Sequence, residues 1–259
     1  MRIKQSICYP ILKPADMSMQ AFVRAAAEIG YAGVEAWGVD ASFEELVSLT
    51  RDAGMTVPSF IGHGSIAGGL NNRAEHGRIE EELHQSIDLA SRCGVAGIIC
   101  FSGNRRPGLG DEEAIDIIAE GLARAAPYAE RKGVNLNLEL LNSKRDHVGY
   151  QCDRTSFAVA VCERVNSPRV KILYDIYHMQ IMEGDVIETI RKNIRRIAHF
   201  HTAGNPGRND MDDTQELNYR GICRAIAETD YDLYVGHEFM PKGDAIEALR
   251  TSFEMCDQG

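Results

Sequence analysis

Four side chains that can bind a metal ion stand at the ends of successive apolar runs in the second half of the chain. They are Glu139, Asp175, His201 and Glu238. A lone carboxylate at such a place is more often a loop residue or a helix cap. Four such residues at matching positions are harder to explain as surface charge. If the apolar runs are strands of a barrel, these side chains would lie at its mouth and would lose water there, which is costly. The pattern therefore predicts one divalent ion held by three carboxylates and one imidazole.

The chemistry that such a site supports is proton transfer next to a carbonyl group. A divalent ion that chelates the carbonyl and hydroxyl oxygens of an α-hydroxycarbonyl compound acidifies the C–H bond between them and stabilises the cis-enediolate. One carboxylate can remove the proton and a second can return it at the neighbouring carbon, so isomerisation needs no organic cofactor. The mainly hard-oxygen ligand set favours Mg²⁺ or Mn²⁺, with Co²⁺ and Zn²⁺ as alternatives.

Four further residues are candidates for contact with a substrate. His178 lies three positions after Asp175, close enough to point into the same site. Arg208 follows Asn-Pro-Gly in a long loop, and its planar guanidinium would suit a substrate carboxylate. Trp37, the only tryptophan, would form a wall of the pocket, and His63 would hydrogen-bond a substrate hydroxyl.

Other polar residues near the strand ends are weaker candidates. We expect His199 and His237 to alternate with the neighbouring ligands, to face the surrounding helices and to pack in the core. Lys144 and His147 lie in the loop that follows the first of the four ligands, and Glu35 ends an earlier strand without an assigned role.

Strands and helices in regular alternation would position these residues. Apolar runs predict strands at 4–8, 33–37, 56–62, 97–101, 135–140, 170–175, 197–201 and 233–238. Periodicity predicts helices at 19–29, 43–53, 80–93, 112–132, 155–165, 186–193, 219–229 and 245–256. The expected N-caps are Ser18, Ser42, Asp111 and Asp244, and glycines that suit helix C-caps follow at Gly30, Gly54, Gly94 and Gly133. Eight of each predict one (β/α)8 TIM barrel domain over residues 1–259.

Three polar loops after strands are long, at 62–78, 140–154 and 202–218. In a (β/α)8 barrel such loops share the face that carries the C-terminal ends of the strands, where active sites lie. The loops and the ligand-type residues therefore predict the same working surface.

The composition of the chain limits the kinds of molecule that the protein is expected to bind. The chain of 259 residues has 44% hydrophobic residues, enough for one large core. Its net charge of −10 disfavours the binding of nucleic acid.

Seven cysteines without a Cys-x-x-Cys pair indicate reduced thiols and a cytoplasmic protein. No apolar stretch approaches the ~20 residues of a membrane span, and no signal peptide is predicted. We expect a small hydroxy-keto acid or sugar as substrate, and assembly into a homo-oligomer is left open.

Several segments together carry a family resemblance. They are Glu-Leu-Leu-Asn-Ser-Lys at 139–144, Tyr-Asp-Ile-Tyr-His-Met-Gln at 174–180, Asn-Pro-Gly-Arg at 205–208, Glu-Leu-Asn-Tyr at 216–219 and Gly-His-Glu at 236–238. The chain resembles the hydroxypyruvate isomerases over essentially its whole length, and the segment at 174–180 is the most specific. That family belongs to the xylose-isomerase-like barrels, with ketose 3-epimerases, inosose dehydratases and the endonuclease IV type of DNA repair enzyme.

The resemblance implies a reaction and roles for residues. It implies metal-dependent interconversion of hydroxypyruvate and tartronate semialdehyde. Glu139 and Glu238 would be the acid/base pair and also metal ligands, with coordination completed by Asp175 and His201. His178 and Arg208 match substrate-contacting positions. The ligand set also resembles that of ketose 3-epimerases, so an epimerase or isomerase of a larger sugar or keto-polyol is the alternative.

Two other functions fit less well. A metal-dependent DNA repair nuclease would need further histidines, including one at the fourth strand end, where the chain has Cys100-Phe-Ser102. A barrel that only binds a sugar or a metal would not require both Glu139 and Glu238.

Overall fold

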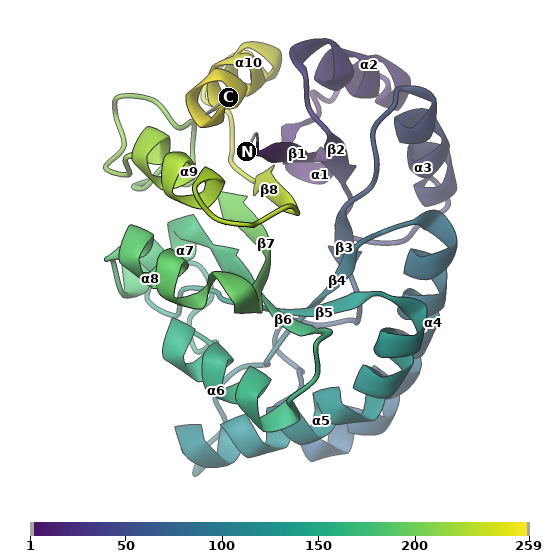
Figure 1. Ribbon diagram of the computed structural model, residues 1–259, viewed down its shortest axis with the longest axis vertical. Helices are drawn as coiled ribbons and strands as arrows, with labels where there is room; N and C mark the ends of the chain where they lie inside the picture. Colours follow the sequence, from purple (N-terminus) through teal and green to yellow (C-terminus); the bar gives the residue numbers. More distant parts are fainter. Residues whose placement is uncertain (1–2, 258–259) are drawn as a thin grey trace.

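The computed structural model describes residues 3–257 and consists of eight parallel strands inside a ring of helices (Figure 1). The predicted (β/α)8 barrel is confirmed. The strands are β1 (Lys4–Cys8), β2 (Gly33–Glu35), β3 (Ser59–Ile61), β4 (Gly97–Cys100), β5 (Asn135–Glu139), β6 (Val170–Asp175), β7 (Ile197–Thr202) and β8 (Tyr234–His237). The α-helices are α1 (Tyr9–Leu12), α2 (Met19–Ile29), α3 (Phe43–Asp52), α4 (His76–Cys93), α5 (Asp111–Lys132), α6 (Thr155–Val165), α7 (Ile176–Met182), α8 (Val186–Asn193), α9 (Tyr219–Ala227) and α10 (Ala245–Cys256). Two 3₁₀ turns are η1 (Arg73–Glu75) and η2 (Ile194–Arg196).

The sheet is nearly closed. Its strand order is β2-β1-β8-β7-β6-β5-β4-β3, with every pairing parallel. Between the two end strands, Gly33 of β2 forms an isolated bridge with Thr56, which precedes β3, and the N–H of Ile61 donates to the carbonyl of Trp37 over 2.9 Å. Pro58 has no N–H to donate, which interrupts the pairing at this seam. The second and third strands are accordingly shorter than predicted.

The ring of helices is closed by its first and last members. Helix α10 packs against α2, as Figure 1 shows at the purple and yellow ends of the chain. Tyr31 lies between them and the barrel: its hydroxyl donates to the carbonyl of Leu249 over 2.8 Å, and its ring meets that of Phe253 edge-on at 5.1 Å. These contacts join residues over 200 positions apart, so the two ends of the chain stabilise each other.

Most predicted helix ends are confirmed. Ser18 and Asp244 cap helices by accepting from the backbone N–H groups of Ala21 and Glu247. All four expected glycines adopt a positive φ, between 74° and 116°, at or just after a helix end. Among the described residues, none of the helices has both the length and the apolar character needed to cross a membrane.

Ser42 is the N-cap residue of α3 as expected, but its side chain makes no capping hydrogen bond, because its hydroxyl donates to Asp40 over 2.6 Å. Two other expectations about helix starts are wrong. Asp111 is the first residue of α5, which makes Gly110 the N-cap. Helices α1 and α7 were not predicted, because each begins directly at the end of a strand and is too short to show a helical period.

The loop after β5 is fixed to the barrel mouth by Tyr150. Its side chain is fully buried, and its hydroxyl donates to the carbonyl of Glu139 and accepts from the N–H of Ser102, both over 3.0 Å. The ends of β4 and β5 are thus joined through one side chain of the loop. This contact holds the backbone of Glu139 in place from outside its own strand.

We expect Tyr150→Phe to lower the free energy of unfolding by about 1–3 kcal/mol, because buried backbone groups lose their partner. Urea denaturation would measure it. Tyr128→Phe is the matched control: that hydroxyl donates to Asp88 near the surface, so the expected change is within about 0.5 kcal/mol. Equal stability of the two variants would contradict the role given to Tyr150.

Candidate active site and metal centre

The four ligand-type residues meet at the C-terminal ends of β5 to β8. Each is at most 6% exposed, and one ligand atom from each lies within 4.8 Å of the others. They are Glu139, Asp175, His201 and Glu238. Parallel strands bring these ends together because each strand end lies beside the next around the barrel. The side chains come from four separate β/α units, so the site exists only in the closed fold.

The arrangement fits a divalent cation. The Nδ1 atom of His201 is buried without a hydrogen-bond partner, and it lies 3.5 Å from Glu139 Oε1 and 3.5 Å from Glu238 Oε2. Oxygen and nitrogen ligands at about 2.1 Å around a six-coordinate ion would lie roughly 3 Å apart, close to this spacing. With His201 neutral as a ligand, three ionised carboxylates beside the guanidinium of Arg208 leave two negative charges, which one divalent ion would balance.

Burial and mutual repulsion shape the pKa values in this group. Burial raises the pKa of Asp175 to about 6, although Arg208 and His201 act in the opposite direction. Burial also raises the pKa of Glu139, and the neighbouring Glu238 adds to the effect. For His201, burial would lower the pKa, but the carboxylate of Glu238 raises it well above the usual value. A cation among these groups would favour the ionised carboxylates.

Glu238 differs from Glu139 in being held by two donors. The indole Nε1–H of Trp37 donates to Oε1 over 2.8 Å, and the Nη2 group of Arg208 donates to Oε2. Burial would raise the pKa of Glu238, but His201 and Arg208 lower it overall. The ionised form of Glu238 is therefore stabilised by the protein itself.

Arg208 has one N–H group that is still available to bind a ligand. Its Nε group is buried and has no hydrogen-bond partner in the structure, and its guanidinium lies over the ring of Tyr177 at 5.8 Å. The residue adopts a positive φ of 56° directly after Gly207. An N–H group that is buried and unpaired is costly, so it indicates a place for an acceptor such as a carboxylate.

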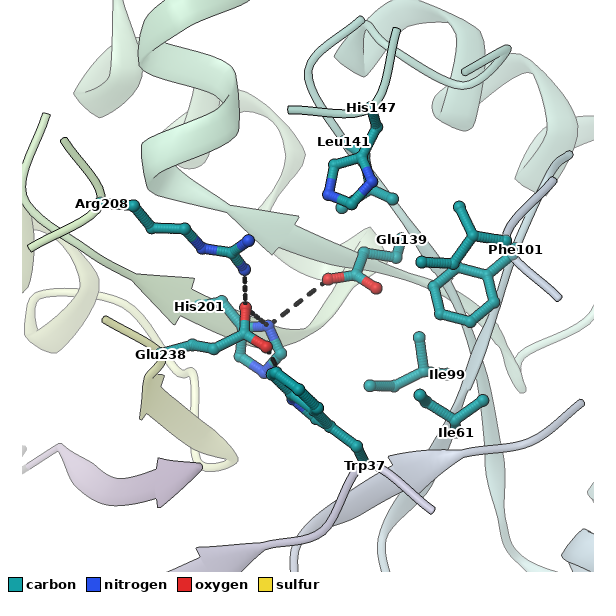
Figure 2. Close-up of a pocket in the computed structure, with 11 residues that line it drawn as sticks. Trp37, Ile61, Ile99, Phe101, Glu139, Leu141, His147, His201, Arg208 and Glu238 are labelled. Atoms are coloured by element: carbon teal, nitrogen blue, oxygen red, sulfur yellow. Dashed lines mark hydrogen bonds and ion pairs between the residues drawn. The ribbon is translucent and has the colours of Figure 1, made fainter. Parts of the chain in front are cut away.

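A small cavity of about 160 Å³ opens over this group. Figure 2 shows Glu139, Glu238, His201 and Arg208 on one side of it, with Trp37 at one edge and His147 at another. The opposite side is apolar, with Ile61, Ile99 and Phe101 in Figure 2, and Leu141 lies beside His147. Ile66 also lines the cavity. A ligand would thus meet charged groups on one side and hydrocarbon on the other.

His178 lies fully buried beside Asp175 and is not among the residues that line the cavity. Its backbone N–H donates to Asp175 Oδ1 over 2.9 Å, and its Nε2 lies 3.7 Å from Asp175 Oδ2. Its Nδ1 lies 2.6 Å from the Nδ2 group of Asn142. The carbonyl oxygen of that amide accepts from the N–H groups of Arg145 and Asp146, so the amide nitrogen must be the atom that faces His178.

This hydrogen-bond chain fixes the tautomer of His178. Because Nδ1 accepts from Asn142, the ring proton sits on Nε2, which has no hydrogen-bond partner in the structure. Burial lowers the pKa of His178 well below its usual value, and Arg208 adds to this, so the ring is neutral. His178 therefore offers an N–H donor toward Asp175 rather than a positive charge.

His63 lies outside the group and faces an adjoining hollow. Its Nε2 accepts from the N–H of Phe101 over 2.9 Å, and its Nδ1 lies 3.2 Å from the carbonyl of Gly64. Both ring nitrogens contact backbone groups, so neither is free to hydrogen-bond a substrate hydroxyl as the sequence predicted. Burial lowers the pKa of His63 to about 4, so the ring is neutral at physiological pH.

The expectation that His199 faces the helices is wrong. Its Nε2 lies 2.9 Å from Glu35 Oε2, the same oxygen that lies 3.1 Å from His201 Nε2. Residues two apart in a strand point to the same side, so His199 and His201 share one face of β7. His237 does pack away from the site, between Thr202 and Gln5.

Sequence reasoning missed two groups of residues at the site. Asn142 and the apolar wall were not singled out, and His147 was rated a weak candidate. The wall residues stand at the ends of β3 and β4 and in the loops after β3, β4 and β5, where apolar side chains look like ordinary core. Asn142 carried a usable signal, because it lies three residues after Glu139 in a loop on the working face.

Comparisons with known proteins agree with the barrel fold. A family model described as xylose isomerase-like TIM barrel matches residues 23–258. The hydroxypyruvate isomerase of Escherichia coli K12 is 31% identical over 232 residues, which cover 87% of this chain and 89% of that protein. The 2-oxo-tetronate isomerase of Cupriavidus necator is 37% identical over 130 residues, about half of each chain.

Solved structures show the same fold at lower identity. An AP endonuclease, family 2, from Brucella melitensis superposes with a TM-score of 0.83 at 24% identity, covering 95% of this chain and 97% of that one. The 3-keto-D-glucoside 4-epimerase of Escherichia coli gives 0.81 at 20% identity, with 98% of both chains covered. These likenesses establish the fold alone.

We expect Asp175→Ala to weaken Mn²⁺ binding by at least about 100-fold, since changes outside the ligand shell already cost ~10–100-fold. Isothermal titration calorimetry would measure the affinity. Asp175 also caps α7, so Asp244→Ala is the matched control: it removes the cap of α10 far from the site. Equal affinity of Asp175→Ala and wild type would rule Asp175 out as a ligand.

Proposed function

The chain belongs to the xylose isomerase-like TIM barrel family, and from this we propose that it is a metal-dependent isomerase interconverting hydroxypyruvate and tartronate semialdehyde. The observation that carries the proposal is a pair of buried glutamates, Glu139 and Glu238, at one small cavity beside a ligand set for a divalent ion. The hydroxypyruvate isomerase of Escherichia coli supports the choice of substrate.

The reaction moves one proton between neighbouring carbon atoms. One glutamate of the pair removes a proton from the hydroxyl-bearing C3 of hydroxypyruvate, and the other delivers a proton to C2 on collapse of the enediolate. The hydroxyl proton leaves the C3 oxygen and a proton is added to the C2 oxygen, so the hydroxyl and carbonyl groups exchange places and atoms and electrons balance without a redox cofactor. A divalent ion at the four ligands would supply a Lewis acid that stabilises the negative charge of the enediolate.

The protein's own residues orient the substrate and the acid/base pair. Trp37 and Arg208 fix the carboxylate of Glu238 through both of its oxygens. The unpaired Nε group of Arg208 can bind the substrate carboxylate while Nη2 stays on Glu238. A carboxylate bound at Arg208 would place the reacting carbons beside the four ligands.

The cavity suits a short substrate. At about 160 Å³ it is smaller than the ~300–1,000 Å³ typical of pockets for drug-sized ligands. Its apolar side has no group that could pair with the extra hydroxyls of a hexose, and an unpaired buried hydroxyl costs about 1–3 kcal/mol. Hydroxypyruvate would direct all its polar groups to the charged side.

One observation favours a longer substrate as the second candidate. An adjoining hollow of about 540 Å³ shares Trp37, Ile61, Ile66 and Phe101 with the cavity. The chain of a larger ketose or keto-polyol could extend into it, as in an epimerase or isomerase of such sugars. The relative named 2-oxo-tetronate isomerase supports the same direction.

A product assay with a panel of substrates separates the two candidates. The panel contains hydroxypyruvate, tartronate semialdehyde, 2-oxo-tetronate and neutral ketoses, each with Mg²⁺ and with Mn²⁺. The proposal expects the highest kcat/KM for hydroxypyruvate. Faster turnover of a neutral ketose than of hydroxypyruvate would contradict the proposal and favour the epimerase.

We expect Glu139→Gln and Glu238→Gln each to lower kcat by about three orders of magnitude or more, because general acid–base catalysis is worth ~10²–10⁴ and ion binding is perturbed as well. Steady-state assays and circular dichroism would separate loss of catalysis from loss of fold. Glu216→Gln is the control, since that residue lies in the loop after β7 and bonds to Asn205 and Gln180 instead. Near-normal activity of either variant would remove that glutamate from the mechanism.

We expect Arg208→Lys to lower kcat/KM for hydroxypyruvate by at least about tenfold, or ~1.4 kcal/mol, because lysine keeps the charge but loses the planar fork. The loss should be smaller for neutral substrates, so the ratio of the two kcat/KM values is the measurement. An unchanged ratio would argue against a carboxylate bound at Arg208.

A further inference from the structure

Glu35 is a second buried carboxylate next to the candidate metal centre, on the far side of His201 from the cavity. It ends β2 and is 1% exposed. Its Oε2 atom lies 2.9 Å from His199 Nε2 and 3.1 Å from His201 Nε2, and its Oε1 accepts from the hydroxyl of Ser6 over 2.6 Å. Three donors thus surround one carboxylate that no step of the reaction uses.

These contacts determine which nitrogen of His201 is free. A carboxylate only accepts hydrogen bonds, so the Nε2 atom that faces Glu35 must carry a proton. An imidazole that binds an ion is neutral and has a single N–H, which leaves the lone pair on Nδ1 for the ion. Nδ1 is the atom that lies 3.5 Å from Glu139 and 3.5 Å from Glu238 without a hydrogen-bond partner.

The neighbouring strand is shaped to admit the Glu35 carboxylate. Gly236 of β8 lies opposite His201 in the sheet register. A Cβ atom at position 236 would lie 2.1 Å from Glu35 Oε1 and 3.1 Å from His201 Cδ2. Glycine inside a strand usually weakens it, and here it leaves room for the carboxylate beside the imidazole.

We propose that Glu35 is a positioning residue for the metal centre: it holds the proton on His201 Nε2 and fixes the ring so that Nδ1 faces the ion. The inference rests on the metal-dependent isomerase proposed above. A histidine ligand whose other nitrogen donates to a carboxylate is held in orientation and made more basic, and losing such a partner typically costs 10–100-fold in metal affinity.

Cys8 suggests an alternative, in which an ion binds on the Nε2 side of His201. Its Sγ atom lies 4.0 Å from the same Nε2, and Cys8, Glu35 and His201 also have ligand atoms within 4.8 Å of one another. An ion among these three would need a deprotonated Nε2. The Glu35 oxygens, however, are already occupied by Ser6 and the two histidines, which favours a hydrogen-bonded carboxylate over a second metal site.

The first test is Mn²⁺ affinity by isothermal titration calorimetry. Glu35→Met, whose thioether is only a weak acceptor, should bind Mn²⁺ about 10–100-fold more weakly than wild type. Glu35→Gln should lose less affinity, because its amide oxygen can still accept. Ser6→Ala and Cys8→Ala leave the bond between Glu35 and His201 intact and should stay within about threefold of wild type. Thermal unfolding of each variant verifies the fold.

The second test reads the proton directly in the wild type and uses a variant only to assign the signal. In protein labelled with ¹⁵N-histidine, His201 of the wild type should show a protonated Nε2 both without metal and with Mg²⁺, assigned by its loss in His201→Gln. In Mg²⁺-loaded protein Nδ1 should be unprotonated. A bare Nε2 in the wild type would overturn the inference.

The affinity series has two further contrary outcomes. Folded Glu35→Met with wild-type Mn²⁺ affinity would remove Glu35 from the metal centre, and a loss in Cys8→Ala as large as in Glu35→Met would move the ion to the Nε2 side. Both outcomes leave the proposed isomerase standing if the wild type binds Mn²⁺ and turns over hydroxypyruvate. A wild type without Mn²⁺ affinity would instead remove the metal centre itself, and with it the role of Glu35.

Discussion

Three carboxylates buried within a few ångströms of one another are the constraint on which the candidate site depends. Like charges repel strongly where water is excluded, so such a group persists only if cations and hydrogen-bond donors compensate it. Arg208 and Trp37 do this for Glu238, while the pKa values of Glu139 and Asp175 stay raised. The compensation by the protein is therefore partial, and the remaining charge matches one divalent ion.

The barrel prevents this repulsion from being relieved by movement. Each carboxylate sits at the end of a strand that pairs with strands on both sides. Contacts from outside the strands add to this: Tyr150 holds the backbone of Glu139, and Asp175 starts helix α7 with one of its oxygens. A site held so firmly is ordered before substrate arrives, which is the condition for electrostatic stabilisation of an enediolate.

The division of the cavity into a charged and an apolar side relates the site to its chemistry. Charge develops on the oxygens of an enediolate, and these would lie on the side of Glu139, Glu238 and Arg208. In the proposed isomerase the opposite wall would exclude water, which would strengthen the electrostatic interactions and protect the reactive intermediate. The same wall would limit how many hydroxyls a substrate can carry, so the protein's selectivity is expected to depend on apolar side chains as much as on charged ones.

The sequence alone determined the barrel and the four ligand-type residues. Apolar runs that alternate with helical periods specify β/α units, and a residue at the end of each run must lie at the barrel mouth, whatever the details of packing. Side-chain partners across the barrel were decided only by the tertiary structure. Glu35 contacts His199 and His201, which lie over 160 residues away in the sequence. The ring nitrogens of His63 contact backbone groups instead of the cavity. Such pairings depend on strand register, rotamer and the space left by a residue such as Gly236, which no periodicity along the chain encodes.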